Sequence, residues 1–89
     1  MVAIFKVVDY IYLSNVGDIY FIDGCQHNVL CIGDVLQDSS GNRFRVKSIE
    51  MIRRDYGDID IEDIPIAMRF DIIDGVKIAG INTYLFKYV

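Results

Sequence analysis

The sequence predicts an all-β protein that folds as a small closed antiparallel β-barrel of six to eight strands. Apolar and polar residues alternate in several short stretches, and runs of turn-forming residues separate these stretches. The sequence shows no amphipathic helical periodicity sustained over ten or more residues. We expect the sheet to close into a barrel because closure removes exposed edge strands.

Length and composition are those of one folded domain spanning residues 1–89. Eighty-nine residues build one hydrophobic core but not two, and a hydrophobic fraction of 53% with 25% charged residues argues against disorder. We expect a monomer or a small homo-oligomer. No apolar run approaches the roughly 18 residues of a membrane span, and the first residues do not resemble a secretory signal. These features predict a cytoplasmic protein that does not bind membranes.

The first half of the chain contains two predicted strands and a return strand. Bulky residues occupy both parities from residue 4 to residue 13, with Phe5 and Val7 on one face and Tyr10 and Tyr12 on the other. We therefore expect the first strand to be covered in part on both sides. A second strand is predicted over 18–23, followed by a turn at Gly24 and a hairpin return over 29–32.

The second half contains the clearest strand signals. A run of turn formers at 38–42 predicts a hairpin before the strand that opens at Arg43. Along that strand Phe44 and Val46 share one parity while Ile49 and Met51 share the other, which predicts a one-residue bulge at 47–49. Unbroken alternation over 66–72 predicts the next strand, a turn is expected at 72–75, and the last strand is expected over 83–88.

Two sequence blocks, IGDVL at 32–36 and VKSIEMIRR at 46–54, resemble the second domain of translation elongation factor Tu and related translational GTPases. Residues 5–9, Gly17, Gly57, Asp58 and residues 65–70 extend the resemblance in the same order, roughly over residues 5–73. The resemblance implies a six-stranded antiparallel barrel that serves in its family as a docking platform beside a nucleotide-binding domain. The loop at 15–18 and the segment 25–28 depart from the family, so we carry over none of its binding residues.

The sequence provides no recognisable catalytic group, metal site or cofactor site. It has no glycine-rich phosphate loop ending in lysine and serine or threonine, which excludes nucleotide hydrolysis. His27 is the only histidine, and Cys25 and Cys31 lack the paired spacing of zinc or redox sites, so free thiols are expected. The carboxylates at 55–63 do not follow the calcium-binding pattern and predict a solvated acidic loop. We therefore expect a protein that is not an enzyme.

Two groups of residues are candidates for binding a partner. Arg43, Arg45 and Lys47 alternate along one predicted strand and should project from the same side at about 7 Å intervals. This basic stripe is either a solvated face partly neutralised by the acidic loop or a contact for phosphate or an acidic protein. Tyr10 and Tyr12 are candidates for a second face, because tyrosines are enriched at interfaces.

The expected function is a non-catalytic protein-interaction module, for which a small inhibitor or immunity-type protein is one specific form. A formal charge of −4 argues against nucleic acid at long range and favours another protein as the partner. The alternative is a ribosome- or RNA-associated translation accessory without GTPase activity, which the family resemblance and the basic stripe support.

Overall fold

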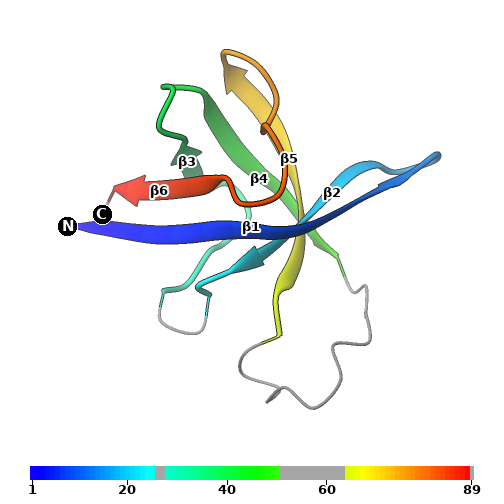
Figure 1. Cartoon of the computed structure of the whole chain (residues 1–89), viewed down its shortest axis with the longest axis horizontal. Coiled ribbons are helices and arrows are strands. Elements are labelled where there is room, and N and C mark those ends of the chain that lie inside the picture. Colours follow the sequence, from blue (N-terminus) through cyan, green and yellow to red (C-terminus); the bar gives the residue numbers. More distant parts are fainter. Residues whose placement is uncertain (26–27, 51–63, 89) are drawn as a thin grey trace.

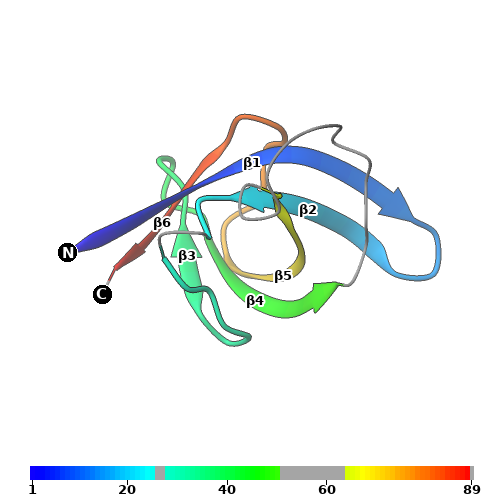
Figure 2. The same cartoon turned by 90° about the horizontal axis from the view of Figure 1, so that it is seen from below.

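Six strands form a closed barrel in the computed structural model, which describes residues 1–25, 28–50 and 64–88. The strands are β1 (Val2–Leu13), β2 (Gly17–Asp23), β3 (Val35–Gln37), β4 (Arg43–Glu50), β5 (Ile66–Asp74) and β6 (Tyr84–Tyr88). They pair antiparallel in the order β1-β2-β5-β4-β3-β6, and β6 returns to β1 (Figures 1 and 2). The predicted all-β closed barrel is therefore confirmed.

The barrel interior is filled by aliphatic and aromatic side chains from all six strands. The side chains of this cluster are buried and include Phe5, Ile22, Leu36, Phe44, Met68 and Leu85. A second cluster lies on the outer side of β1, β2 and β5, where Ile19, Phe21 and Ala67 are buried. Val8 and Ile11 of β1 pack on this outer cluster. The expectation that the first strand is covered in part on both sides is thus confirmed.

A bulge divides β1 into two halves of different phase. The register with β2 shifts between Val7 and Asp9, so one residue of β1 is additional there. Before the bulge the odd-numbered residues Phe5 and Val7 point into the barrel. After the bulge the parity is reversed: Tyr10 packs against the interior cluster and Ile11 against the outer one. The bulge therefore turns Tyr10 inward.

The predicted bulge in β4 is also present. The register between β4 and β5 shifts between Val46 and Ser48, within the segment where the apolar parity changes. Ile49 consequently lies opposite the buried Met68, but it is itself 38% exposed. Met51 and the acidic segment 55–63 lie outside the described residues.

Two long connections join strands that lie on opposite sides of the barrel. Residues 24–34 lead from β2 to β3 at one end, and residues 75–83 lead from β5 to β6 at the other. Each connection buries one aliphatic side chain in the interior cluster, Leu30 in the first and Ile78 in the second. The predicted hairpin return over 29–32 is wrong, since these residues form no strand and the chain crosses the barrel end instead.

The hairpin predicted at 38–42 is confirmed, and Asp38 organises it. The buried Asp38 carboxylate accepts hydrogen bonds from the backbone of Ser40 at 3.0 Å and from the backbone and amide side chain of Asn42, both at 2.9 Å. Asn42 in turn accepts from the backbone N–H of Val76 at 3.0 Å. Gly75 has a φ of 87°, and a Cβ there would lie 2.0 Å from the Asn42 Oδ1 atom, so only glycine fits.

The last two strands lie close to their predicted bounds. β5 continues to Asp74, so the turn expected at 72–75 begins only at Gly75. β6 begins at Tyr84, one residue later than expected. Within the described segments no helix is long and apolar enough to cross a membrane.

Candidate functional site

The basic stripe lies on the outer surface of β4, as predicted. Arg43, Arg45 and Lys47 are all exposed, while Phe44 and Val46 between them are buried. Lys47 lies at the β4 bulge, so its spacing from Arg45 differs from that of a regular strand. The structure therefore confirms a common outward direction for the stripe.

Carboxylates on the neighbouring strand β5 reduce the charge of this stripe. Asp74 lies directly opposite Arg43 and Asp71 directly opposite Arg45. Asp71 also lies 3.9 Å from Lys47 in an exposed ion pair. The sequence interpretation assigned this neutralisation to residues 55–63, which the structure does not describe, whereas the described acids come from β5.

Tyr10 and Tyr12 do not extend the basic stripe. β1 and β4 are separated by β2 and β5 in the barrel, and Tyr10 faces the interior rather than the outer surface. The Tyr10 hydroxyl donates a short hydrogen bond to Asp18, which raises the pKa of Tyr10. Tyr12 is 63% exposed near the β1–β2 turn. The two predicted groups are therefore separate features of the molecule.

A surface that sequence reasoning did not identify lies on the outer side of β1 and β6. In the antiparallel pairing of β1 with β6, Val2 lies opposite Tyr88, Ile4 opposite Phe86 and Lys6 opposite Tyr84. Residues directly opposite in an antiparallel pair point to the same side, and the intervening Phe5 and Leu85 point inward. We call the apolar members of this outer surface the aromatic face: Val2, Ile4, Tyr84, Phe86 and Tyr88.

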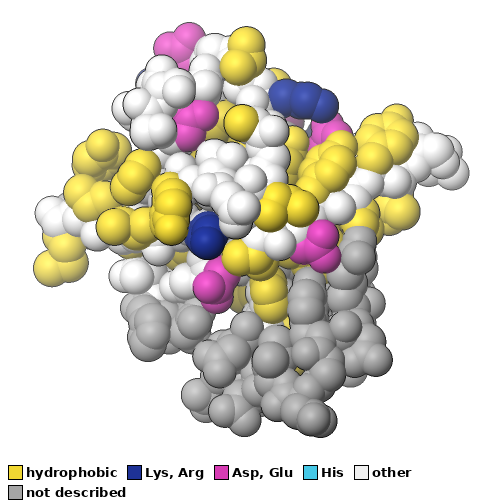
Figure 3. Space-filling model, in the orientation of Figure 1, with side chains coloured by type: hydrophobic (Ala, Val, Ile, Leu, Met, Phe, Trp, Pro, Cys, Tyr) yellow, Lys and Arg dark blue, Asp and Glu magenta, His cyan; other side chains and the backbone are white. Residues whose placement is uncertain are grey.

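The aromatic face is largely open to solvent. Tyr88 is 67% exposed, Ile4 53% and Tyr84 51%, values that are high for large apolar side chains in one contiguous group. Figure 3 shows hydrophobic side chains gathered over the part of β1 and β6 that holds both chain ends. Lys6 borders this face, with its Nζ atom 5.5 Å from the centroid of the Tyr84 ring.

A hollow of about 190 Å³ continues the aromatic face across β3 toward β4. Gln37 of β3 pairs with Phe86 on one side and with Arg43 on the other, so these residues form one lateral row. Phe86, Tyr88 and Arg43 all line the hollow. The apolar surface is thus bordered by a cation at each side, Lys6 on β1 and Arg43 on β4.

The sequence contains a signal for this face that was not used. Tyr84, Phe86 and Tyr88 occupy every second position of the last strand, and Leu85 alone has the opposite parity of an aliphatic core residue. Because alternate residues of a strand point to the same side, these three aromatic side chains are expected on one face of the sheet. That the first and last strands are neighbours could not be read from this local pattern.

The two cysteines lie near acidic side chains, Cys25 near Asp23 and Cys31 near Asp34. Cys25 and Cys31 are free thiols, and burial followed by the nearby Asp23 charge raises the pKa of Cys25 to about 11. Asp34 accepts from Lys87 Nζ at 2.8 Å and from the Cys31 backbone N–H at 2.8 Å, and these bonds, that from Lys87 foremost, hold the pKa of Asp34 below its ordinary value. His27 lies outside the described residues.

Comparison of the chain with protein-family models, with curated proteins and with solved structures returned no match. The relation to the second domain of elongation factor Tu thus has the sequence resemblance as its support.

Proposed function

We propose that this protein is a non-catalytic protein-interaction module whose partner docks on the aromatic face. The observation that supports this proposal is the group of exposed tyrosine and aliphatic side chains on β1 and β6. Tyrosine provides a large apolar contact area, a hydroxyl for hydrogen bonding and few rotatable bonds, which is why it is enriched among interface residues that dominate binding energy. The rigid barrel holds these side chains in place before a partner arrives.

The chemistry of the face defines the partner. Lys6 and Arg43 lie on either side of the apolar surface, but Arg43 lies opposite Asp74, whereas Lys6 has no ion pair in the part of the chain that the structure describes. We propose a protein segment with aliphatic or aromatic side chains in its middle and a carboxylate at the end that meets Lys6. The hollow beside Phe86 and Tyr88 would receive one of the partner's apolar side chains.

Protein binding accounts for the surface better than the alternative of RNA binding. Affinity for a phosphate backbone depends on uncompensated Lys and Arg charges. Asp71 and Asp74 lie beside the basic stripe, and the formal charge of the whole chain is −4. An inhibitor or immunity-type protein is one specific form of the proposed module, whereas a ribosome-associated accessory is the outcome that the experiment below distinguishes from it.

The test uses a photo-crosslinking amino acid at position 88 and affinity capture from native lysate. We expect the crosslinked partner peptide, identified by mass spectrometry, to be apolar with an Asp or Glu residue at one end. The double variant Tyr84→Ser/Tyr88→Ser should reduce capture at least tenfold because it removes the two most amphipathic anchors. Tyr12→Ser is the matched control, since Tyr12 is 63% exposed but does not belong to the aromatic face.

Three outcomes would overturn the proposal. Unchanged capture by the double variant would exclude the aromatic face, and RNA or ribosomal proteins lost on Arg45→Glu would support the translation accessory. Crosslinks that map only to a second copy of this chain, with a dimer in sedimentation equilibrium, would make the face a self-association surface.

A further inference from the structure

A cavity of about 320 Å³ lies at the barrel end that the connection 75–83 crosses. Tyr10 and Tyr20 form one wall, and residues 77–81 of the connection form the other. Mouths of β-barrels are frequent sites for small molecules, and this volume is at the lower end of the range found for such sites. The cavity is separate from the aromatic face, because it lies on the inner side of β1 beyond the bulge.

The wall of the cavity contains the side chain of a buried tyrosine, Tyr20. Tyr20 is 4% exposed, and no described residue forms a hydrogen bond with its hydroxyl. Burial, followed by the charge of Asp18, raises the pKa of Tyr20 to about 12, so the hydroxyl is protonated at neutral pH. A buried donor in this state is stabilised by a ligand that offers an acceptor.

The Tyr20 ring packs against two other aromatic rings. The ring centroids of Tyr10 and Tyr20 are 5.1 Å apart, and those of Tyr20 and Phe70 are 6.0 Å apart. Ile78 and Ile81 line the facing side, where Ile78 is buried. This environment is suited to the body of a small aromatic or aliphatic molecule.

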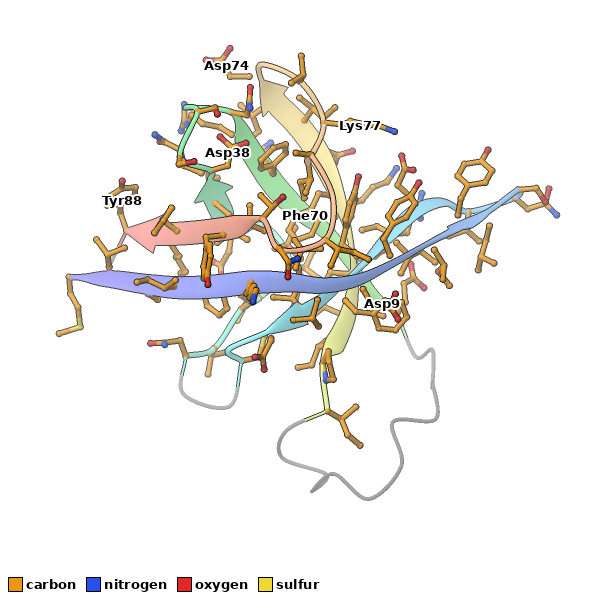
Figure 4. The ribbon with its side chains drawn as sticks, in the orientation of Figure 1. Asp9, Asp38, Phe70, Asp74, Lys77 and Tyr88 are labelled. Atoms are coloured by element: carbon orange, nitrogen blue, oxygen red, sulfur yellow. The ribbon has the colours of Figure 1, made fainter. Side chains whose placement is uncertain are left out.

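A lysine side chain borders the cavity. Lys77 lines it and has no ion pair within the described ranges. Figure 4 shows Lys77 extending from the connection toward the side of the barrel where β1 and β2 form their hairpin. Asp18, which accepts a hydrogen bond from the Tyr10 hydroxyl, is not among the residues that line the cavity. The charged side chain among the lining residues is Lys77, which favours an anionic ligand over a cationic one.

We propose that this cavity binds a small monocarboxylate with an apolar ring or chain, its carboxylate accepting from Lys77 and the Tyr20 hydroxyl and its apolar part lying against the tyrosine rings and Ile78. This inference does not depend on the proposed docking function, since a barrel could bind such a ligand with or without a protein partner. It adds a ligand site at one end of the same barrel.

The test titrates benzoate, its neutral analogue benzamide and the cation benzylamine into isotopically labelled protein followed by amide NMR shifts. We expect saturable shifts from benzoate at residues 77–81 and at Tyr10 and Tyr20, with benzamide binding about tenfold more weakly. Lys77→Met, which keeps an apolar stem, should weaken benzoate about tenfold and leave benzamide unchanged. Tyr20→Phe should weaken both benzoate and benzamide, because it removes a neutral donor.

Lys47→Met is the matched control, because Lys47 is an exposed lysine on β4 that does not line the cavity. The same spectra show whether each variant is folded. Benzoate shifts that do not saturate, equal affinity for benzamide, or a preference for benzylamine would each overturn the proposal. Loss of binding in Lys47→Met to the same extent as in Lys77→Met would also overturn it, because the effect would then come from net charge.

Discussion

Each end of the barrel is crossed by a long connection, but the contacts of the two connections differ. Leu30 closes one end and Ile78 the other, each as the buried aliphatic side chain of a long crossing connection. At the Leu30 end, Lys87 fixes the connection by donating to Asp34 at 2.8 Å and to the Val29 carbonyl at 3.2 Å. At the Ile78 end, the space beside the connection is open as a cavity.

This difference shows how one topological solution serves two purposes. An antiparallel barrel needs its ends covered so that the interior side chains stay dry, and a single inserted aliphatic residue does this at low cost in chain length. Where hydrogen bonds and an ion pair fix the connection, the end contributes to stability. Where a cavity lies between the connection and the tyrosines of β1 and β2, the end has room for a ligand.

The largest effect on stability is expected from truncating the two aliphatic side chains at the barrel ends, Leu30 and Ile78. Leu30→Ala should lower the free energy of unfolding by about 3 kcal/mol, because it leaves a void in the interior cluster. Ile78→Ala should cost about 2 kcal/mol, since Ile78 borders an open cavity that solvent can enter. Urea denaturation of both variants measures the difference, and an equal or larger loss for Ile78→Ala would contradict this account of the two ends.

A smaller effect concerns the ion pair at the Leu30 end. The hydrogen bonds from Lys87 and from the Cys31 backbone lower the pKa of Asp34 in the folded chain. The contribution of Asp34 to the stability of the fold is therefore fully present above its unfolded-state pKa of about 3.9. This contribution is lost as the pH falls through the lower pKa that Asp34 has in the folded chain.

Asp34→Asn should accordingly cost about 1.5 kcal/mol at pH 7 and almost nothing in strong acid. The measurement is the urea midpoint of both proteins at each pH. Asp71→Asn is the control, because its ion pair with Lys47 is exposed and should contribute little. A destabilisation by Asp34→Asn that is the same at all pH values would mean that the ion pair is not its cause.

The smallest effect is expected at the cavity, in alkaline solution. Because the pKa of Tyr20 is about 12 in the folded chain and 10.0 for an ordinary tyrosine, Tyr20 stabilises the fold fully below pH 10 and loses this contribution between pH 10 and 12. Relative to the original chain, Tyr20→Phe should gain about 1 kcal/mol of stability between pH 8 and pH 11. Denaturation at both pH values tests this, with Tyr12→Phe as the exposed control; a difference between Tyr20→Phe and the original chain that is the same at both pH values would contradict it.

Local patterns in the sequence were sufficient for much of the fold. The alternation over 66–72, the turn formers at 38–42 and the parity change near Lys47 correspond to β5, the β3–β4 hairpin and the β4 bulge. Each depends on neighbours in sequence, either through strand periodicity or through turn conformation. These are the features that a single sequence determines most directly.

Features that depend on distant pairing were not predictable in the same way. Apolar residues at 29–32 resemble a strand, but Leu30 instead covers the barrel end because β2 and β3 lie on opposite sides. The aromatic face requires that Val2 lies beside Tyr88, a contact between the two ends of the chain. Tyr10 was identified as a candidate, but its inward direction depends on a bulge in β1 that its mixed parity did not locate.

The bulge in β1 has a practical consequence for engineering this protein. Because the strand changes phase there, Val2 and Ile4 contribute to one surface while Tyr10 contributes to another. A library that varies the outward positions 2, 4 and 6 would change the proposed docking surface while leaving the cavity as it is. A library at position 10 and along 77–81 would change the cavity and leave that surface intact, so the two regions of one small scaffold can be varied independently.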